Sequence, residues 1–407
     1  MAITDKKTGI WGLDQTYNKI NQGSIWNFSG QVGLWSVGGA GNGVSGQNDG
    51  VNRSSPIQIP GTTWSSDLGK IATTPYNNRY HIGAIKTDNT LWVWGKNTDG
   101  TLGLNDKTSR SSPTQLPGSW TTVSASYESF LAQKTDGTLW TWGFNDSGSA
   151  LGHNQSGYPA SYSSPKQVGS DTTWAPGGVM SKENGMVAKT DGSLWMWGKN
   201  SAGVLGINVA YSPSNKGRSS PVQIPGTTWN SGAGKLAMTS PGTQAAAIKT
   251  DGTLWSWGNN DNGQLGQNSR TYYSSPVQIP GTTWSYIMHN GSGMFFATKT
   301  DNTLWAWGQN HPDWKLLGLG DTVDRSSPTQ LPGTTWNRPN SVGYQCNVIS
   351  KTDGTLWATG SPQRNVIGLN GTGTANPDNN GSPIQCGGDG WIGAKGSLYY
   401  MIGTAQH

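Results

Sequence analysis

Residues 249–266 read KTDGTLWSWGNNDNGQLG, and close variants of this stretch recur along the 407-residue chain. Its Asp-Gly pair stands between two apolar runs, which is the preferred chemistry of a two-residue hairpin turn. The two Trp of LWSWG are two residues apart, so they share one face of the strand that follows the turn. The stretch predicts two antiparallel strands followed by a Gly- and Asn-rich loop.

Three landmarks of this kind repeat along the sequence, each roughly every 55 residues, which is the signature of a repeat architecture. One is a Trp that in most units follows Gly-Thr-Thr or a similar stretch: Trp64, Trp120, Trp174, Trp229, Trp284, Trp336 and Trp391. Another is Leu-Trp: Trp35, Trp92, Trp140, Trp195, Trp255, Trp305 and Trp357. The last is Ser-Pro before a short apolar strand: Pro56, Pro113, Pro165, Pro221, Pro276, Pro328 and Pro383.

These landmarks predict an all-β fold, a seven-bladed β-propeller of four-stranded antiparallel blades. The Ser-Pro strand suits the edge of each blade, because Pro cannot donate to a neighbouring strand. The chain ends predict ring closure: SLYYMIGT (397–404) resembles the second strand of an earlier unit, and residues 34–60 carry only the third and fourth strands. One blade shared by both ends removes the open edges of an arc.

The recurring Trp-Gly-x-Asn-x-x-Gly-x-Leu-Gly core, complete in WGKNTDGTLG (94–103) and WGNNDNGQLG (257–266), resembles the regulator of chromosome condensation repeat. The resemblance implies a seven-bladed propeller with a split closing blade over residues 34–404. It leaves residues 1–33 as an N-terminal arm and residues 405–407 as a tail. NHPDWKLLG (310–318) is a longer variant of the loop, and ATGSPQRNVIGL (358–369) lacks the second Trp. Members of that family act on a small GTPase, sense ultraviolet light or bind enzymes, so the fold alone does not give the function.

Composition argues against several functions. The net charge is +5 and no run of Lys or Arg occurs, so no nucleic-acid surface is predicted. The chain shows no signal peptide and no apolar stretch of membrane-spanning length. Two buried thiols are favoured for Cys346 and Cys386, with a disulfide between them left open.

No catalytic, metal or cofactor site is predicted. The five histidines (His81, His153, His289, His311 and His407) fall at different phases of the repeat. The loop acids Asp99, Asp146 and Asp261 lack the terminal Glu of a calcium loop, so turn stabilisation is favoured. The arginines before Ser-Ser-Pro (Arg53, Arg110, Arg218 and Arg325) are interpreted as rim charges that pair with loop acids. The paired Trp of the LWxW strands are interpreted as core between blades.

The N-terminal arm is the clearest departure from the repeat. Leu13, Tyr17 and Ile20 fall on one face of a short helix, which needs a surface to dock on, either this propeller or another protein. Residues Gly9, Trp11, Leu13, Tyr17 and Trp26 also resemble short segments of virion structural proteins of marine tailed phages. That resemblance implies attachment to a virus particle, with Trp11, Leu13, Tyr17, Ile20 and Trp26 as the binding residues.

Two long loops depart from the repeat as well, at residues 152–165 and 207–221. They carry Tyr158, Tyr162 and Tyr211 among Ser, Gly and Asn, a composition found in adaptable recognition surfaces and equally in solvated loops. These Tyr are predicted as exposed binding residues.

The sequence therefore favours a non-enzymatic binding or structural module without cofactors. The preferred hypothesis is a phage virion-associated protein, a fibre or capsid decoration, whose partners are other virion proteins or a host-surface receptor and whose location is the virion. The alternative is a cytoplasmic bacterial protein-interaction propeller, an inhibitor or adhesin. Guanine-nucleotide exchange on a small GTPase rests on family analogy alone.

Overall fold

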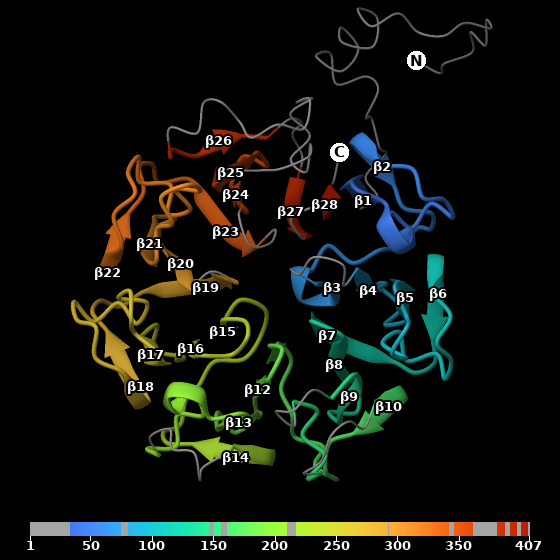
Figure 1. Cartoon of the computed structure of the whole chain (residues 1–407), viewed down its shortest axis with the longest axis horizontal. Coiled ribbons are helices and arrows are strands. Elements are labelled where there is room, and N and C mark those ends of the chain that lie inside the picture. Colours follow the sequence, from blue (N-terminus) through green and yellow to red (C-terminus); the bar gives the residue numbers. More distant parts are fainter. Residues whose placement is uncertain are drawn as a thin grey trace, which may run out of the picture.

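The computed structural model describes residues 33–74, 80–145, 150–155, 161–209, 217–291, 293–341, 346–360, 381–386, 391–396 and 400–405. Over these residues the chain forms seven four-stranded antiparallel sheets, which stand as blades around one axis (Figure 1). The all-β, seven-bladed prediction is confirmed. Three single-turn 3-10 helices complete the described part: η1 (Gly41–Gly43), η2 (Leu68–Lys70) and η3 (Ser201–Gly203). None of the described helices is long and apolar enough to cross a membrane.

Each blade has the same order of strands from the axis outward, and the outermost strand is the Ser-Pro strand. The innermost strands are β3 (Ile71–Thr73), β7 (Trp120–Ser126), β11 (Val179–Met180), β15 (Leu236–Met238), β19 (Trp284–Asn290), β23 (Trp336–Ser341) and β27 (Trp391–Gly396). The second strands are β4 (His81–Ile85), β8 (Ser129–Lys134), β12 (Asn184–Ala188), β16 (Gln244–Ile248), β20 (Met294–Lys299), β24 (Cys346–Lys351) and β28 (Tyr400–Ala405). The third strands are β1 (Gly33–Gly38), β5 (Leu91–Gly95), β9 (Leu139–Gly143), β13 (Leu194–Gly198), β17 (Leu254–Gly258), β21 (Leu304–Gly308) and β25 (Leu356–Gly360). The outer strands are β2 (Arg53–Gln58), β6 (Arg110–Leu116), β10 (Tyr162–Gln167), β14 (Arg218–Ile224), β18 (Tyr273–Ile279), β22 (Arg325–Gln330) and β26 (Ile384–Gln385).

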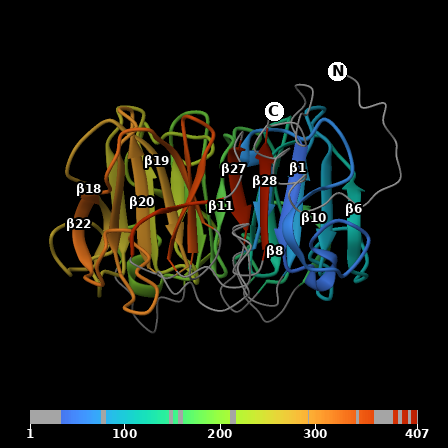
Figure 2. The same ribbon diagram turned by 90° about the horizontal axis from the view of Figure 1, so that it is seen from above.

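Both ends of the described chain meet in one blade, as the sequence predicts. Its strand order is β2-β1-β28-β27. Strand β1 pairs with β28 from Gly33 opposite Ala405 to Gly38 opposite Tyr400, and the two strands lie side by side in Figure 2. The ring is therefore closed by a sheet whose strands come from opposite ends of the sequence, and β1 has a partner on each side.

The Asp-x-Thr-x-Trp spacing of the hairpins has a physical cause. In the β16–β17 hairpin, a carboxylate oxygen of Asp251 accepts the Thr253 backbone N–H at 2.9 Å and the Thr253 hydroxyl at 2.7 Å. Trp255 Nε1 then donates to the same hydroxyl oxygen at 2.9 Å. This relay of three side chains recurs at Asp88-Thr90-Trp92, Asp136-Thr138-Trp140, Asp191-Ser193-Trp195, Asp301-Thr303-Trp305 and Asp353-Thr355-Trp357.

The landmark Trp at or just before the inner strand packs against both Trp of the third strand in four blades, those of Trp64, Trp120, Trp229 and Trp284. The Trp229 ring centroid is 6.2 Å from those of Trp255 and Trp257. The Lys249 ammonium lies 4.4 Å from the Trp255 ring centroid and 4.9 Å from that of Trp229, within the range of a cation–π interaction. Lysines take the same position over two Trp rings in five other blades: Lys86, Lys134, Lys189, Lys299 and Lys351.

The second Trp of the third strand joins neighbouring blades. Trp257 is completely buried, and its Nε1 donates to the Val204 carbonyl oxygen of the preceding blade at 2.6 Å. Equivalent bonds run from Trp94 to Val44, from Trp197 to Ala150 and from Trp307 to Gln264. The interpretation of these Trp pairs as core between blades is confirmed for the second Trp of each pair. The first Trp is half-buried and belongs to its own blade.

The Asn and Gly of the repeat core shape the loop after the third strand. Asn260 is completely buried; its side-chain oxygen accepts the Leu265 N–H at 2.9 Å, and its amide nitrogen donates to Ser269 and Thr271 carbonyls, each at 2.9 Å. Gly258 ends β17 with φ +107°, and an added Cβ would lie 2.2 Å from the Thr243 carbonyl oxygen. Only glycine fits this closure of the loop onto the sheet.

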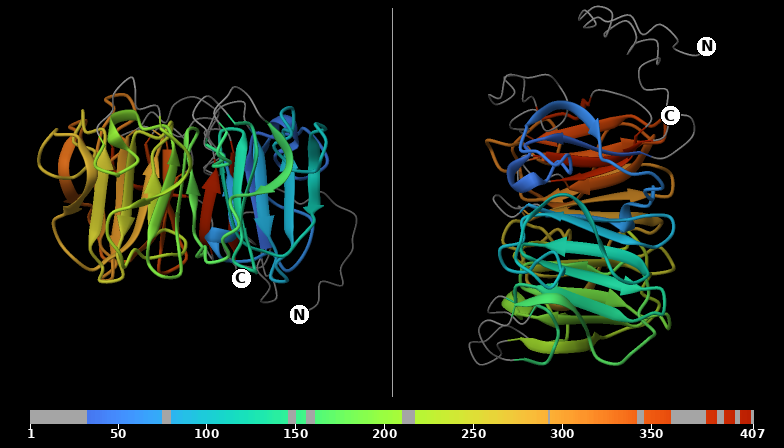
Figure 3. Two further views of the ribbon diagram at one scale, coloured as in Figure 1. Left: turned by 90° about the horizontal axis from the view of Figure 1, so that it is seen from below. Right: turned by 90° about the vertical axis from the view of Figure 1, so that its right-hand side faces the viewer.

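The ring has two faces, seen at the ends of the strands in Figure 3. The turn face carries the hairpins between second and third strands, where Trp64 bridges Lys86. The loop face lies at the other ends of those strands, where His81 pairs with Gly95. Because Gly33 pairs with Ala405 at the end of β1 that corresponds to the hairpins, the described chain begins on the turn face.

Candidate functional site

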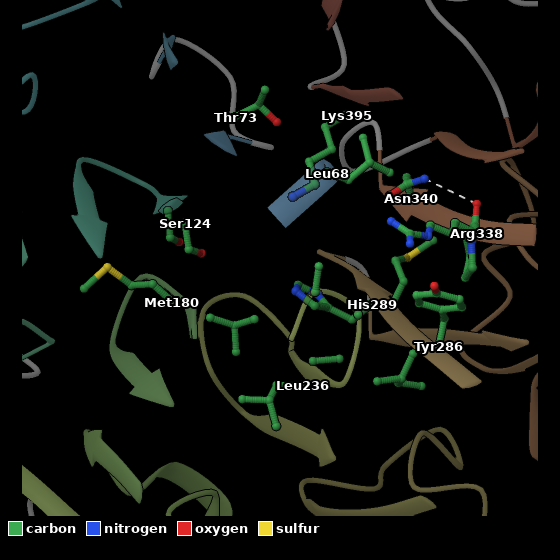
Figure 4. Close-up of a pocket in the computed structure, with 18 of the residues that line it drawn as sticks. Leu68, Thr73, Ser124, Met180, Leu236, Tyr286, His289, Arg338, Asn340 and Lys395 are labelled. Carbon is green, nitrogen blue, oxygen red and sulfur yellow. Dashed lines mark hydrogen bonds between the residues drawn. The ribbon is translucent and has the colours of Figure 1, made fainter. Parts of the chain in front are cut away.

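The inner strands surround a cavity of about 210 Å³ on the axis of the ring. All seven contribute to its lining, for example Thr73 of β3, Ser124 of β7, Met180 of β11 and Leu236 of β15. Figure 4 shows Ser124 and Met180 apart from Tyr286, Arg338 and Lys395, which lie on the other side of the cavity. We call this space the axial cavity. Its wall is uncharged on one side and carries basic groups on the other.

Arg338 and Lys395 line the basic side, and Lys235 lies against the ring of Tyr286, which also lines it; we call these three cations the axial cationic cluster. The Tyr286 ring of β19 holds two of them: the Lys235 ammonium is 4.8 Å from its centroid and the Arg338 guanidinium carbon 4.7 Å. The Lys235 ammonium also donates to the Ser285 carbonyl oxygen. An aromatic face thus positions two like charges that would otherwise repel one another.

Lys395, on β27, supplies the third charge. Its ammonium donates to the Ile71 carbonyl oxygen at 2.9 Å, across the junction between the last and first inner strands. Burial lowers the pKa of Lys395 to about 8; the nearby carboxylate of Asp67 opposes this effect and the Arg338 charge adds to it. Burial and then the Arg338 charge likewise lower the pKa of Lys235. The charge of Arg338 therefore lowers the pKa of both lysines.

The axial cationic cluster lacks counter-ions within the described part of the chain. None of its three members forms an ion pair with a described carboxylate, whereas most other described pairs stand at the rim or in loops. The Arg338 guanidinium donates no hydrogen bond to a described residue; the bonds recorded for Arg338 use its backbone, including the 3.3 Å bond from Asn340 drawn in Figure 4. Arg338 itself lines the axial cavity.

A second cavity, of about 320 Å³, lies on the loop face. Amides line it, with Gln244, Gln264 and Gln309 around a His311 ring that stacks on Trp314 at 4.1 Å. Trp314 belongs to the longer loop variant at residues 310–318, so the insertion seen in the sequence adds an aromatic side chain to this wall.

The arginines before Ser-Ser-Pro form structural pairs, as predicted, in three blades. Arg53, Arg110 and Arg325 each contact the carboxylate four residues earlier, at distances of 2.8, 2.5 and 2.5 Å. The partners are Asp49, Asp106 and Asp321. Arg218 instead donates to the Gly217 carbonyl at 3.0 Å. They stand on outer strands and are not brought together on one ligand.

The described histidines have different surroundings. His81 is buried against Phe130, with ring centroids 5.0 Å apart, and His289 lines the axial cavity. Burial, helped by the Lys166 charge, lowers the pKa of His153 to about 4. Within the described ranges no group of three or more His, Cys, Asp or Glu side chains could hold a metal ion. His407 and Asp146 lie outside the described residues.

The two cysteines are free thiols in one buried cluster of the β23–β26 blade and its neighbour, so the disulfide left open by the sequence is not formed. Burial raises the pKa of Cys346 to about 12. The pKa of Cys386 is raised by burial and by its proximity to Cys346. Both thiols are protonated at neutral pH and act as small apolar groups.

The binding residues predicted from the sequence lie mostly outside the described residues: Trp11, Leu13, Tyr17, Ile20, Trp26, Tyr158 and Tyr211. Tyr162 is described and differs from the prediction. It lies in β10, half-buried, with its ring 5.2 Å from that of His153 and its hydroxyl bonded to Gln155 and Lys166. These contacts make it a packed strand residue, because the strand begins earlier than the Ser-Pro landmark suggests.

The sequence prediction missed the axial cationic cluster. Its members occupy no common position in the repeat: Lys235 precedes an inner strand, Arg338 is near the start of another and Lys395 is near the end of a third. A search for basic residues on or next to the innermost strands would have found them, since most inner-strand residues elsewhere are uncharged.

Comparisons with known proteins agree with this architecture. Residues 88–132 and 251–289 match the regulator of chromosome condensation (RCC1) repeat. The human Protein RCC2 is 31% identical over 132 residues, which are 31% of this chain and 24% of that protein. The mitochondrial RCC1 domain-containing protein RUG3 of Arabidopsis thaliana is 23% identical over 308 residues, 72% of this chain and 66% of that protein. The chain thus spans less than two thirds of either relative.

Solved structures show the same fold. Prp20p of Saccharomyces cerevisiae, described with its binding to Gsp1p and histones, superposes with a TM-score of 0.73 at 15% identity, covering 93% of this chain and 92% of that one. Human WBSCR16 superposes with a TM-score of 0.73 at 16% identity, covering 93% of this chain and 99% of that one. Yeast RCC1 (Prp20) bound to Kap60 gives 0.72 at 16% identity, covering 100% and 95%. The chain is therefore a seven-bladed propeller in which residues 88–132 and 251–289 match the regulator of chromosome condensation repeat.

Proposed function

We propose that this chain is a non-enzymatic protein-binding propeller. The observation that carries the proposal is its fold: a closed ring of the regulator of chromosome condensation type, whose structural relatives include proteins described with bound protein partners. Its described carboxylates support this role, because those with lowered pKa values are held in hairpin turns or rim pairs. Such acids stabilise turns and offer no acid–base pair at a shared site.

The more specific proposal is a virion-associated protein, located on a phage particle, that attaches through residues 1–33. Its support is the resemblance of residues 9–26 to phage structural segments. The ring geometry is compatible with it: the arm joins β1 at Gly33, on the turn face. Attachment there leaves the loop face, with the cavity beside Trp314, directed away from the particle and toward a host surface.

Purified particles test this proposal. Full-length protein and a Trp11→Ala/Trp26→Ala variant are expressed in cells infected with a phage that lacks its own copy, and particles are quantified by mass spectrometry. The expected result is wild-type protein at a fixed number of copies per particle and at least tenfold less of the variant. A Tyr272→Ala variant, changed on the outer rim, is the matched control and should be retained. Wild-type protein absent from particles would overturn the virion proposal and leave the binding proposal standing.

The alternative is a soluble cytoplasmic propeller that binds a bacterial protein, as inhibitor or adhesin, or that acts on a small GTPase. The yeast relative that binds Gsp1p makes the last of these testable. An exchange factor speeds release of labelled GDP from its GTPase at substoichiometric concentration. An inhibitor forms a stable 1:1 complex and lowers the activity of its target enzyme.

A further inference from the structure

We propose that the axial cationic cluster binds an oxyanion, a carboxylate or phosphate group, inside the axial cavity. The described lining of this site includes no residue of the arm, and the site goes beyond the protein-binding role. The inference rests on Arg338 and Lys395, which line the cavity, and on Lys235, which contacts the ring of the lining residue Tyr286.

The first argument is charge. Lys235, Arg338 and Lys395 reach the same region from the starts of β15 and β23 and from β27, and no described carboxylate forms an ion pair with any of them. Asp67 is the carboxylate that influences Lys395, but its side chain accepts the Gly69 N–H at 2.9 Å at the start of η2. Three positive charges and one such acid leave a net positive site, in which a bound anion relieves repulsion between like charges.

The second argument is the supply of hydrogen-bond donors. The Arg338 guanidinium has a planar fork of N–H groups, suited to two oxygens of one carboxylate or phosphate, and none is used by a described residue. Each lysine ammonium has three N–H donors, of which one is recorded in a bond to the protein: Lys235 to Ser285 and Lys395 to Ile71. Donors therefore remain for a ligand on all three side chains.

The third argument is preorganisation. The Tyr286 ring fixes Lys235 and Arg338 on its surface, and the Ile71 carbonyl fixes Lys395, so little side-chain freedom is lost on binding. Ser124 on the opposite wall and Thr73 offer hydroxyl groups without a competing charge. A cavity of about 210 Å³ admits a group well above the size of one water molecule. The chemistry selects an anion; its source is either a free small molecule or an acidic side chain of a protein partner.

Isothermal titration of the full-length protein at low ionic strength tests the site, with inorganic phosphate, citrate and a short Glu-rich peptide as separate probes. At least one probe is expected to bind, and Arg338→Gln and Lys395→Gln should each weaken that probe tenfold or more. Arg270→Gln is the matched control: it removes one positive charge from an exposed rim side chain and should leave the affinity unchanged. Binding of phosphate or citrate alone identifies a free anion, and binding of the peptide alone identifies an acidic side chain.

Thermal unfolding of each variant shows whether it folds, and Lys235→Gln provides a third variant if Arg338→Gln does not. No binding of any probe to the wild type overturns the proposal. Binding that all three cluster variants and Arg270→Gln weaken equally also overturns it, because the effect then follows net charge and not the axial cavity. Neither result depends on attachment through the arm, so the proposed function is tested separately.

Discussion

The hydroxyl of Thr359 donates a 2.8 Å hydrogen bond to the carbonyl oxygen of Leu316 in the preceding blade. Thr359 occupies the position of the second Trp in the LWxW strands, and Leu316 occupies the position of the carbonyl that those Trp bind. The β25 strand thus keeps the link between blades after losing the indole ring.

Replacing this hydroxyl should loosen the junction. Thr359→Val keeps the shape of the side chain but removes the hydroxyl that donates to the buried Leu316 carbonyl. We therefore expect a loss of about 1 to 2 kcal/mol in the free energy of unfolding. Thr359→Ser retains the hydroxyl and serves as the control. Urea unfolding measures both; equal stability of the Val variant and the wild type would contradict the role of this bond.

Trp229 and Trp257 lie in one blade, and comparing them measures the contribution of an indole hydrogen bond to stability apart from the contribution of ring burial. Trp229 and Trp257 are both buried, but Trp257 Nε1 donates to Val204 while Trp229 Nε1 has no hydrogen-bond partner among the described residues. We expect Trp257→Phe to cost about 1 kcal/mol more than Trp229→Phe. Denaturant unfolding of the pair gives the difference, and a larger loss for Trp229→Phe would refute the assignment.

The hairpin relay should depend on the hydroxyl between Asp and Trp. Thr253→Ala removes the donor to Asp251 and the acceptor for Trp255 Nε1, with an expected loss of about 1 kcal/mol. Thr253→Ser restores both bonds, as Ser193 does naturally in another blade. A Ser variant as unstable as the Ala variant would show that the methyl group, not the hydroxyl, is what matters.

Acid should weaken the fold through His153. Its Nε2 bonds the Thr141 hydroxyl at 2.9 Å, and the pKa of about 4 lies below the usual 6.5. Between pH 6.5 and pH 4 the unfolded chain therefore binds a proton at His153, whereas His153 of the folded chain stays neutral. Stability is fully present above pH 6.5 and falls toward pH 4, by roughly 1 to 3 kcal/mol from this group.

A His153→Gln variant isolates this effect, because Gln can still donate to Thr141 and does not titrate. Its unfolding free energy should vary less between pH 7 and pH 4 than that of the wild type, measured by chemical denaturation at each pH. Gln309→Ala, which changes a side chain on the loop face that does not titrate, is the control and should keep the wild-type pH profile. Identical profiles for the His153 variant and the wild type would rule out a buried neutral His153.

Removing residues 1–32 should leave the ring stable, because every described strand lies between Gly33 and Ala405. We expect the melting temperature of the truncated chain to stay within about 2 °C of the wild-type value, as for residues outside a packed core. A removal that extends through β1 deletes the partner of β2 and β28 and should cause a large drop. Unfolding of the shorter truncation would show that the arm is part of the ring.

The repeat made the fold predictable, because hairpin turns, edge Pro and Trp spacing are local signals that seven copies reinforce. The split closing blade followed from matching the incomplete units at both ends. The relay through Thr253 and the bond from Trp257 to Val204 were not predicted, since they need the rotamers of both partners. Tyr162 was misplaced because its burial depends on His153 and Lys166 across the loop. The axial cationic cluster could not be predicted from any one unit, because Arg338 and Lys395 belong to different inner strands and Lys235 precedes a third, so the three come together only in the closed ring.

The split closing blade has a consequence for synthesis. Lys395 and Ile71 form a hydrogen bond although they are 324 residues apart in sequence, and β1 and β28 pair over a comparable separation in sequence. At about 5 to 20 residues per second, a ribosome needs tens of seconds to make the chain between them. During that time β1 presents an unpaired edge that cannot yet find its own partner. Two chains made on the same messenger RNA can exchange their β27–β28 pairs, so interlocked dimers are the misassembly to expect when synthesis is slow and ribosomes are crowded on the message.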